Sequence, residues 1–156
     1  MIKVGVIGAN GQLGSDICRV FRACGHEVTG WNHDILDIID FDGARRCFRS
    51  ARPDIVINTA AMHNVENCEA YPLQAYAVNA VGARNLALLA SELDFCLLHI
   101  STDYVFDGRQ SRPYTEDDIP FPLNVYGNSK YAGELLVRST AKRFFIVRVS
   151  GIYGVN

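Results

Sequence analysis

The sequence predicts an α/β protein with a doubly wound parallel sheet and helices on both faces. Three observations lead to this prediction. Short runs rich in β-branched residues alternate with longer segments of helical period along the chain. The candidate strands are apolar on both faces, as parallel strands covered by helices are. A glycine-rich turn also follows the first candidate strand and opens the first helix, which is typical of such sheets.

The elements follow one another in strand–helix order. The candidate strands are residues 3–7, 27–31, 54–60, 96–100 and 144–149, and a short extra strand near 35–38 is also compatible with the pattern. The helical segments lie near residues 12–24, 41–51, 73–93 and 125–140, each with Leu, Ile, Val or Ala at three- and four-residue spacing. Ligands of doubly wound sheets bind beyond the carboxyl ends of the strands. Function is therefore expected in the loops that follow the five strands.

Composition narrows the class of protein. The 156 residues are 49% hydrophobic and 21% charged with a net charge of −2, which predicts a single globular domain without the basic stripe that nucleic acids require. No apolar run approaches the roughly 18 to 20 residues of a membrane span, so no membrane partner is expected. Five scattered cysteines without a Cys-x-x-Cys pair, and histidines without ligand spacing, indicate reduced thiols, a cytoplasmic location and no metal site.

The first loop, GANGQLG, predicts a dinucleotide site. Gly8 permits a tight turn, Gly11 lets the backbone approach a pyrophosphate, and Gly14 allows the helix to pack closely on the sheet. The N–H groups at the helix start then face the anion with the positive end of the helix dipole. The expected cofactor is NADPH or NADH. The predicted cofactor-binding residues of this loop are Gly8, Asn10, Gly11, Gln12, Leu13 and Gly14.

The end of the second strand bears on the choice between the two cofactors. An acidic residue that holds the adenosine ribose is expected about twenty residues after the glycines, and Asn32 occupies that place. An amide neither repels a 2′-phosphate as a carboxylate does nor clamps it as an arginine would. Neither cofactor is therefore favoured by Asn32. Asp37, followed by Ile38, is a candidate contact for the adenine, although a solvated surface acid is the competing interpretation.

A hydroxyl, a tyrosine and a lysine converge on the same rim. Ser101 and Thr102 leave the carboxyl end of the fourth strand, and Tyr126 precedes Lys130 by four residues at the start of a helix. Helical spacing alone makes such pairs common, so the pair is informative only within this cleft. A tyrosine of ordinary pKa near 10 can act as an acid near neutrality if a neighbouring ammonium stabilises its phenolate. Lys130 is predicted to supply that charge and to reach the ribose hydroxyls.

The chain resembles the extended short-chain dehydrogenase/reductases and, among them, the dTDP-4-dehydrorhamnose reductases. The matching stretches, in family order, are GANGQLG, LDI, RPDIVINTAA, YAVNAVGARNL, ISTDYVFDG, PLNVYGNSKYAGE and RVSGIYG. The resemblance implies a Rossmann-type fold and reduction of the 4-keto group of a nucleotide-activated deoxysugar. It implies that Tyr126 is the general acid, Lys130 its electrostatic partner and Thr102 a hydroxyl that binds the reacting carbonyl. It further implies that Ala60, Ala61 and His63 line the riboses, and that Asn79 fixes the loop after the third strand.

Two positions separate reaction classes within that family. Sugar-nucleotide dehydratases usually carry Asp-Glu after the threonine, whereas this chain has Asp103 and Tyr104, which favours simple carbonyl reduction. Asp103 and Ser101 are then candidate contacts for sugar hydroxyls. Gly151 stands near the sugar where reductases commonly have tryptophan, so the identity of the sugar stays open.

The family also continues beyond the last shared motif. Residues 1–156 are expected to form the NAD(P)-binding domain, and the C-terminal substrate domain of the family is absent from this sequence. Two alternatives stay open: a non-catalytic NAD(P)-binding regulatory protein similar to the regulatory subunit of methionine adenosyltransferase, and a sugar-nucleotide epimerase or dehydratase. A homodimer is a further open possibility.

Overall fold

Five parallel strands form the central sheet of the structure, a computed structural model that describes residues 1–154. The strands are β1(Lys3–Ile7), β2(Glu27–Trp31), β3(Ile55–Asn58), β4(Cys96–Thr102) and β5(Phe144–Val149). Their spatial order is β2-β1-β3-β4-β5. The chain moves from β1 outward to β2 and then returns to β3 on the other side of β1. This reversal opens a crevice at the carboxyl ends of β1 and β3, the usual ligand position in such sheets.

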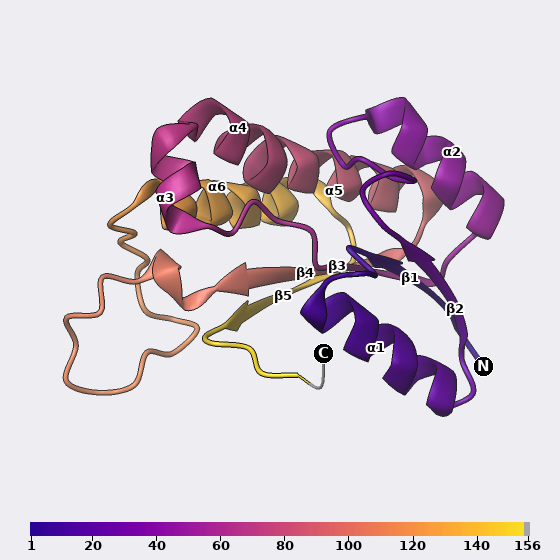
Figure 1. Cartoon of the computed structure of the whole chain (residues 1–156), viewed down its shortest axis with the longest axis horizontal. Coiled ribbons are helices and arrows are strands. Elements are labelled where there is room, and N and C mark those ends of the chain that lie inside the picture. The colour runs from indigo at the N-terminus through magenta and orange to yellow at the C-terminus, as the bar shows by residue number, and fades with distance from the viewer. Residues whose placement is uncertain (155–156) are drawn as a thin grey trace.

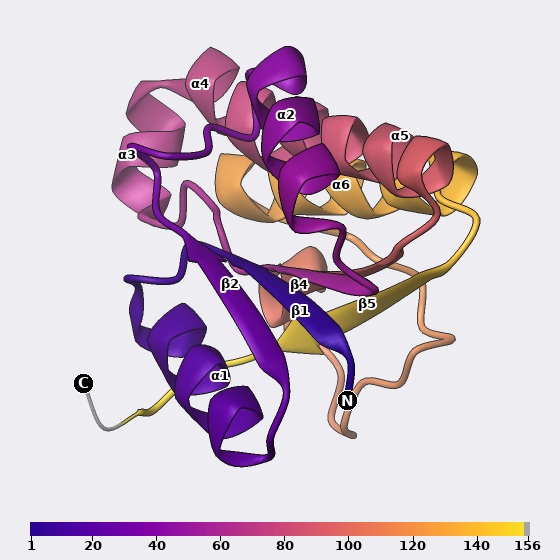
Figure 2. The same cartoon turned by 90° about the vertical axis from the view of Figure 1, so that its right-hand side faces the viewer.

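Helices cover both faces of the sheet, as expected (Figures 1 and 2). One face carries α1(Gln12–Ala23) alone, and the other carries the remaining helices, because right-handed crossovers place connections that run in opposite directions on opposite faces. No helix in residues 1–154 is long and apolar enough to cross a membrane. The helices of the second face are α2(Phe41–Ala51), α3(Val65–Ala70), α4(Pro72–Tyr76), α5(Ala83–Leu93) and α6(Val125–Thr140).

The predicted helix at 73–93 is present, but a π-helical turn, η1(Ala77–Gly82), divides it into α4 and α5. The short helix α3 was not predicted. The extra strand near 35–38 is wrong: the backbone N–H groups of Ile35 and Leu36 both donate to the carbonyl of Asn32, which makes a turn. Leu36 and Ile38 are apolar because both pack into the core, and not because they lie in a sheet.

The core lies mainly between the sheet and the helices of the second face. Its aromatic centre is a chain of edge-on contacts, with ring centroids 5.4 Å apart between Trp31 and Phe48 and 5.2 Å apart between Phe48 and Phe95. A smaller cluster under α1 contains Val4, Val6, Cys18 and Ile57. Burial of apolar side chains on both faces holds the strands rigid, so the loops at their carboxyl ends have fixed starting points.

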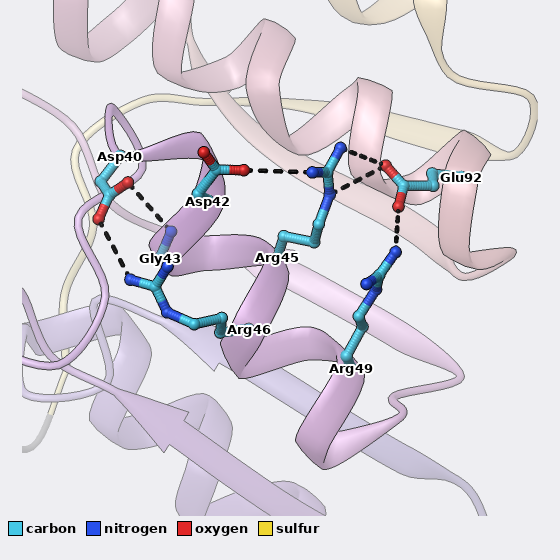
Figure 3. Close-up of polar contacts among 7 residues, drawn as sticks. All are labelled: Asp40, Asp42, Gly43, Arg45, Arg46, Arg49 and Glu92. Atoms are coloured by element: carbon cyan, nitrogen blue, oxygen red, sulfur yellow. Dashed lines mark hydrogen bonds and ion pairs between the residues drawn. The ribbon is translucent and has the colours of Figure 1, made fainter.

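Surface ion pairs connect α2 to α5 (Figure 3). Glu92 accepts hydrogen bonds from Arg45 at 2.9 Å and from Arg49 at 3.0 Å, and these bonds lower the pKa of its carboxyl group. At the start of α2, the Asp40 side chain caps the helix by accepting the N–H of Gly43 at 3.0 Å. Such exposed pairs contribute little stability each.

Candidate active site

A cleft of about 950 Å³ lies at the carboxyl ends of the strands. Its walls are the loops that follow β1, β2, β3, β4 and β5 together with the first turns of α6. All but two of the residues predicted from the sequence line it. Those that do are Gly8, Asn10, Gly11, Gln12, Leu13, Gly14, Asp37, Ile38, Ala60, Ala61, His63, Ser101, Thr102, Asp103, Tyr126, Lys130 and Gly151.

The glycine loop forms a bare cradle. Gly8 has a φ of 77°, in the left-handed region that favours glycine. A Cβ at Gly14 would overlap the carbonyl oxygen of Gly8, so only glycine lets α1 start this close to the loop. Gly11 is the N-cap of α1, and no side chain in residues 1–154 caps that end. The N–H groups of the first turn thus face the cleft without a capping acceptor, which fits a pyrophosphate.

Asn32 does not line this cleft, and its predicted contact with the adenosine ribose stays a prediction. Its side-chain oxygen accepts the N–H of Ile35 at 3.2 Å, and Asn32 lines an adjoining depression that it shares with Asn10 and Arg22. The neighbouring His33 lines the main cleft instead. Sequence spacing located the end of β2 correctly, but the turn at 32–35 decides which side chain faces the cleft.

The loop after β3 is held from behind by Asn79. The Asn79 side chain accepts the N–H of Met62 at 2.9 Å and donates to the carbonyl of Met62 at 2.9 Å and to the hydroxyl of Ser129 at 2.9 Å. Asn79 is 1% exposed and lies in the π-helical turn η1. It therefore shapes the wall formed by Ala60 and Ala61 without lining the cleft.

Tyr126 enters the cleft from the first turn of α6. The side chain of Asn124 caps this helix by accepting the N–H of Gly127 at 2.8 Å, which fixes the position of the first turn. The ring of Tyr126 packs edge-on against that of Tyr104 at 5.6 Å between centroids. Burial raises the pKa of the Tyr126 phenol, and the hydrogen bond with Thr102 opposes this only in part.

The amine of Lys130 contacts β4, and its predicted action on Tyr126 and on the ribose stays a prediction. Lys130 is 2% exposed, and its ammonium group donates to the carbonyl of Ile100 at 2.6 Å and lies 3.4 Å from Nε2 of His99. Burial lowers the pKa of Lys130 from 10.5 to about 8. The amine thus faces β4 rather than the phenol, although both residues line the same cleft.

Ser101 and Thr102, at the end of β4, form different hydrogen bonds. The Ser101 hydroxyl donates to Glu134 at 2.5 Å, and Glu134 is fully buried and paired with Arg148 at 2.7 Å. The hydroxyl proton of Ser101 is thereby committed to this network and is not free for a substrate. Thr102 donates to the Asp103 carboxylate at 3.2 Å and accepts the N–H of Tyr104 at 3.2 Å.

Among the wall residues that sequence reasoning did not select are His33, Met62, Tyr104 and Ile152. A signal for Tyr104 was present in the sequence, because it follows Asp103 directly; it lies in the turn η2(Asp103–Val105). The other three belong to loops whose path is set by packing. Gly151, predicted near the substrate, is exposed at the mouth of the cleft.

Comparison with known proteins agrees with this geometry. A family model described as RmlD substrate binding domain matches residues 2–156. The chain is 43% identical to the spore coat polysaccharide biosynthesis protein SpsK of Bacillus subtilis, over 99% of this chain and 54% of that protein. It is 40% identical to a dTDP-4-dehydrorhamnose reductase of Mycolicibacterium smegmatis, over 97% of this chain and 46% of that protein.

A solved structure is similarly close. The crystal structure of a dTDP-4-dehydrorhamnose reductase from Bacillus anthracis in complex with NADP superposes with a TM-score of 0.94 at 38% identity, covering 97% of this chain and 54% of that one. The present chain therefore spans about half the length of the relatives that it matches.

Proposed function

The chain belongs to the family described as RmlD substrate binding domain, and on that premise we propose that it is the cofactor-binding and catalytic half of an NAD(P)H-dependent nucleotide-sugar reductase. The proposed reaction reduces the 4-keto group of a nucleotide-activated deoxysugar of the dTDP-4-dehydrorhamnose type. Residues 1–156 form the NAD(P)-binding domain in this proposal, and the remaining length of the relatives corresponds to a substrate domain. Relatives named dTDP-4-dehydrorhamnose reductases, one of them solved with NADP, support it.

One observation carries the proposal: a single cleft joins the bare glycine loop to Thr102 and Tyr126. The glycine cradle and the uncapped start of α1 fit a dinucleotide. Ala60 and Ala61, whose side chains are short and apolar, line the same cleft. When bound, the reduced nicotinamide supplies the hydride. The residues of this chain must then bind the sugar, orient its carbonyl and provide one proton.

Tyr126 is suited to provide that proton. Its phenol holds the proton at neutral pH, which is the state that a general acid requires. Burial raises the pKa of that phenol and so weakens it as an acid, an effect that positive charge near the phenol would have to offset when cofactor and substrate are bound. Reduction of a carbonyl places negative charge on its oxygen, and a donor held in a partly buried cleft stabilises that charge more strongly than one in water.

Thr102 is the second candidate donor. Its hydroxyl donates to the neighbouring Asp103 in this structure and would have to turn toward the substrate carbonyl. Asp103 is exposed and is followed by Tyr104, not by a glutamate. The cleft therefore lacks the extra carboxylate at this position that sugar dehydration would use, which favours reduction.

The test is Tyr126→Phe in the protein encoded by the complete reading frame. Turnover of dTDP-4-dehydrorhamnose, followed as loss of NADPH absorbance, is expected to fall by about 10² to 10⁴. Cofactor affinity should change little, because phenylalanine keeps the ring contact with Tyr104. Tyr104→Phe is the matched control, since it removes a hydroxyl from the same cleft, and it should alter turnover by no more than a few-fold.

A full rate in Tyr126→Phe would refute the role of Tyr126. If the wild-type protein binds NADPH but reduces no nucleotide sugar, a binding or regulatory role replaces the reductase.

A further inference from the structure

A row of buried polar side chains runs behind the cleft, from β3 through β4 to α6. Asn58 and His99 are partners in the register of β3 and β4, so their side chains lie side by side on one face of the sheet. Nδ2 of Asn58 lies 3.1 Å from Nδ1 of His99, and Nε2 of His99 lies 3.4 Å from Nζ of Lys130. All three residues are no more than 2% exposed.

The direction of the hydrogen bonds in this row can be determined from its first member. The N–H of Ala60 donates to Oδ1 of Asn58 at 3.1 Å, and because an N–H can only donate, the atom that it meets must be the amide oxygen. The amide nitrogen of Asn58 therefore faces His99 and donates to Nδ1. Burial lowers the pKa of His99 well below 6.5, so its ring is neutral. A neutral ring that accepts at Nδ1 carries its hydrogen on Nε2.

Lys130 consequently meets an N–H and not a lone pair. An ammonium group has three donors and no acceptor, so it cannot form a hydrogen bond with the Nε2–H of His99. A free amine has a lone pair that accepts this N–H while one of its own hydrogens still donates to the carbonyl of Ile100, 2.6 Å away. The arrangement therefore favours loss of a proton from Lys130.

Negative charge on the neighbouring elements would raise the pKa of Lys130, but the main carboxylate there is already paired with a cation. Glu134, one turn along α6, raises the pKa of Lys130, but its carboxylate is already paired with Arg148 of β5. Cys68 of α3, Asp103 and Tyr104 raise the pKa of the Tyr126 phenol, which lies one helical turn before Lys130 on α6.

We propose that His99 is a positioning residue that lowers the proton affinity of Lys130, and that cofactor binding is coupled to uptake of one proton by Lys130 from solvent. The second part rests on the proposed function. A bound dinucleotide brings negative charge and ribose hydroxyl acceptors into the cleft, and both favour the ammonium form. Above about pH 8 the cofactor-free chain thus holds mostly an amine turned toward His99, whereas the loaded chain holds a cation.

The proton affinity of Lys130 can be measured directly, because the chain has only three lysines. Lysine labelled with ¹³C at Cε gives three resonances, which are followed from about pH 6 to about pH 11 and assigned with Lys130→Met. The exposed Lys3 and Lys142 serve as internal references. Lys130 is expected to titrate near pH 8, well below the ordinary lysine pKa of 10.5.

Two variants test the role of His99. In His99→Gln, the side-chain amide can turn its oxygen toward Lys130. In His99→Asn, the amide oxygen still accepts from Asn58, but nothing replaces the Nε2–H. Both should raise the proton affinity of Lys130 by about tenfold or more. An unchanged Lys130 titration in either folded variant would mean that burial alone sets it, and would overturn the inference.

Coupling is tested by calorimetric titration of NADPH at pH 8 in two buffers of different ionisation enthalpy. Wild type should take up about half a proton per NADPH bound, because Lys130 is about half protonated at that pH. His99→Gln should take up much less, and equal uptake in the two proteins would refute the coupling. If the chain binds no NADPH, the coupling and the proposed function both fail, whereas the Lys130 titration decides the role of His99 by itself.

Discussion

Lys130→Met is expected to stabilise the folded chain at neutral pH while it weakens cofactor binding. Lys130 is almost completely buried, and burial lowers its pKa from 10.5 to about 8. A buried ammonium group at this position therefore lowers the free energy of unfolding, a cost that is expected where a residue is kept for its function. Methionine has similar length and flexibility, carries no charge and can fill the same space.

The sign and size follow from proton linkage. Between pH 8 and pH 10.5 the unfolded chain still holds the lysine proton while the folded chain has released it, so the unfolding free energy of wild type rises with pH in this window. The full rise corresponds to about 3 kcal/mol at about 1.4 kcal/mol per pH unit. Below pH 8 the folded chain bears the whole cost. Lys130→Met lacks this dependence, so its advantage over wild type should be greatest at pH 7 and should shrink by up to about 3 kcal/mol toward pH 10.5.

The loss of the bond from Lys130 to the Ile100 carbonyl lowers the stability of the variant by about 1 to 3 kcal/mol, but equally at every pH. The pH dependence of the difference is therefore the diagnostic quantity. Urea unfolding at several pH values, followed by the fluorescence of the single, buried Trp31, measures it. Lys142→Met, at an exposed lysine, is the control and should show no such trend. A constant difference between Lys130→Met and wild type from pH 7 to pH 10 would refute the reasoning.

Three further predictions concern the cofactor and the reaction. NADH and NADPH should bind wild type with affinities within about tenfold of each other in fluorescence titrations. Asn32→Asp should weaken the binding of NADPH about tenfold more than that of NADH, since a carboxylate repels the 2′-phosphate. A hundredfold preference for either cofactor in wild type would contradict this view of Asn32. Gly11→Val should abolish the binding of both cofactors in the same titrations, because a side chain would occupy the pyrophosphate cradle. Its far-ultraviolet circular dichroism should match that of wild type, and retained binding would mean that the loop is only a turn. Thr102→Val should lower turnover in the complete protein with little change in cofactor affinity, whereas a change in affinity alone would assign the hydroxyl to cofactor binding.

The order of the elements and the position of the cleft were predictable from the sequence. β-branched runs, helical periodicity and glycine spacing reflect backbone preferences over a few residues, and these largely decide where strands and helices form. The carboxyl ends of parallel strands then meet at one edge, so the glycine loop, Thr102 and Tyr126 were expected to lie together. The structure places all three in one cleft.

The partners of individual side chains depended on packing between distant segments. Lys130 follows Tyr126 by one helical turn, but its amine bonds the Ile100 carbonyl and approaches His99, because β4 passes under α6. Asn79 forms its hydrogen bonds with Met62 from a π-helical turn that no local sequence pattern predicted. Hydrogen bonds and pKa values depend on which groups tertiary packing brings within about 3 Å of one another and on how completely it excludes water from them. The spacing of residues along the chain determines neither the contacts nor the exclusion of water.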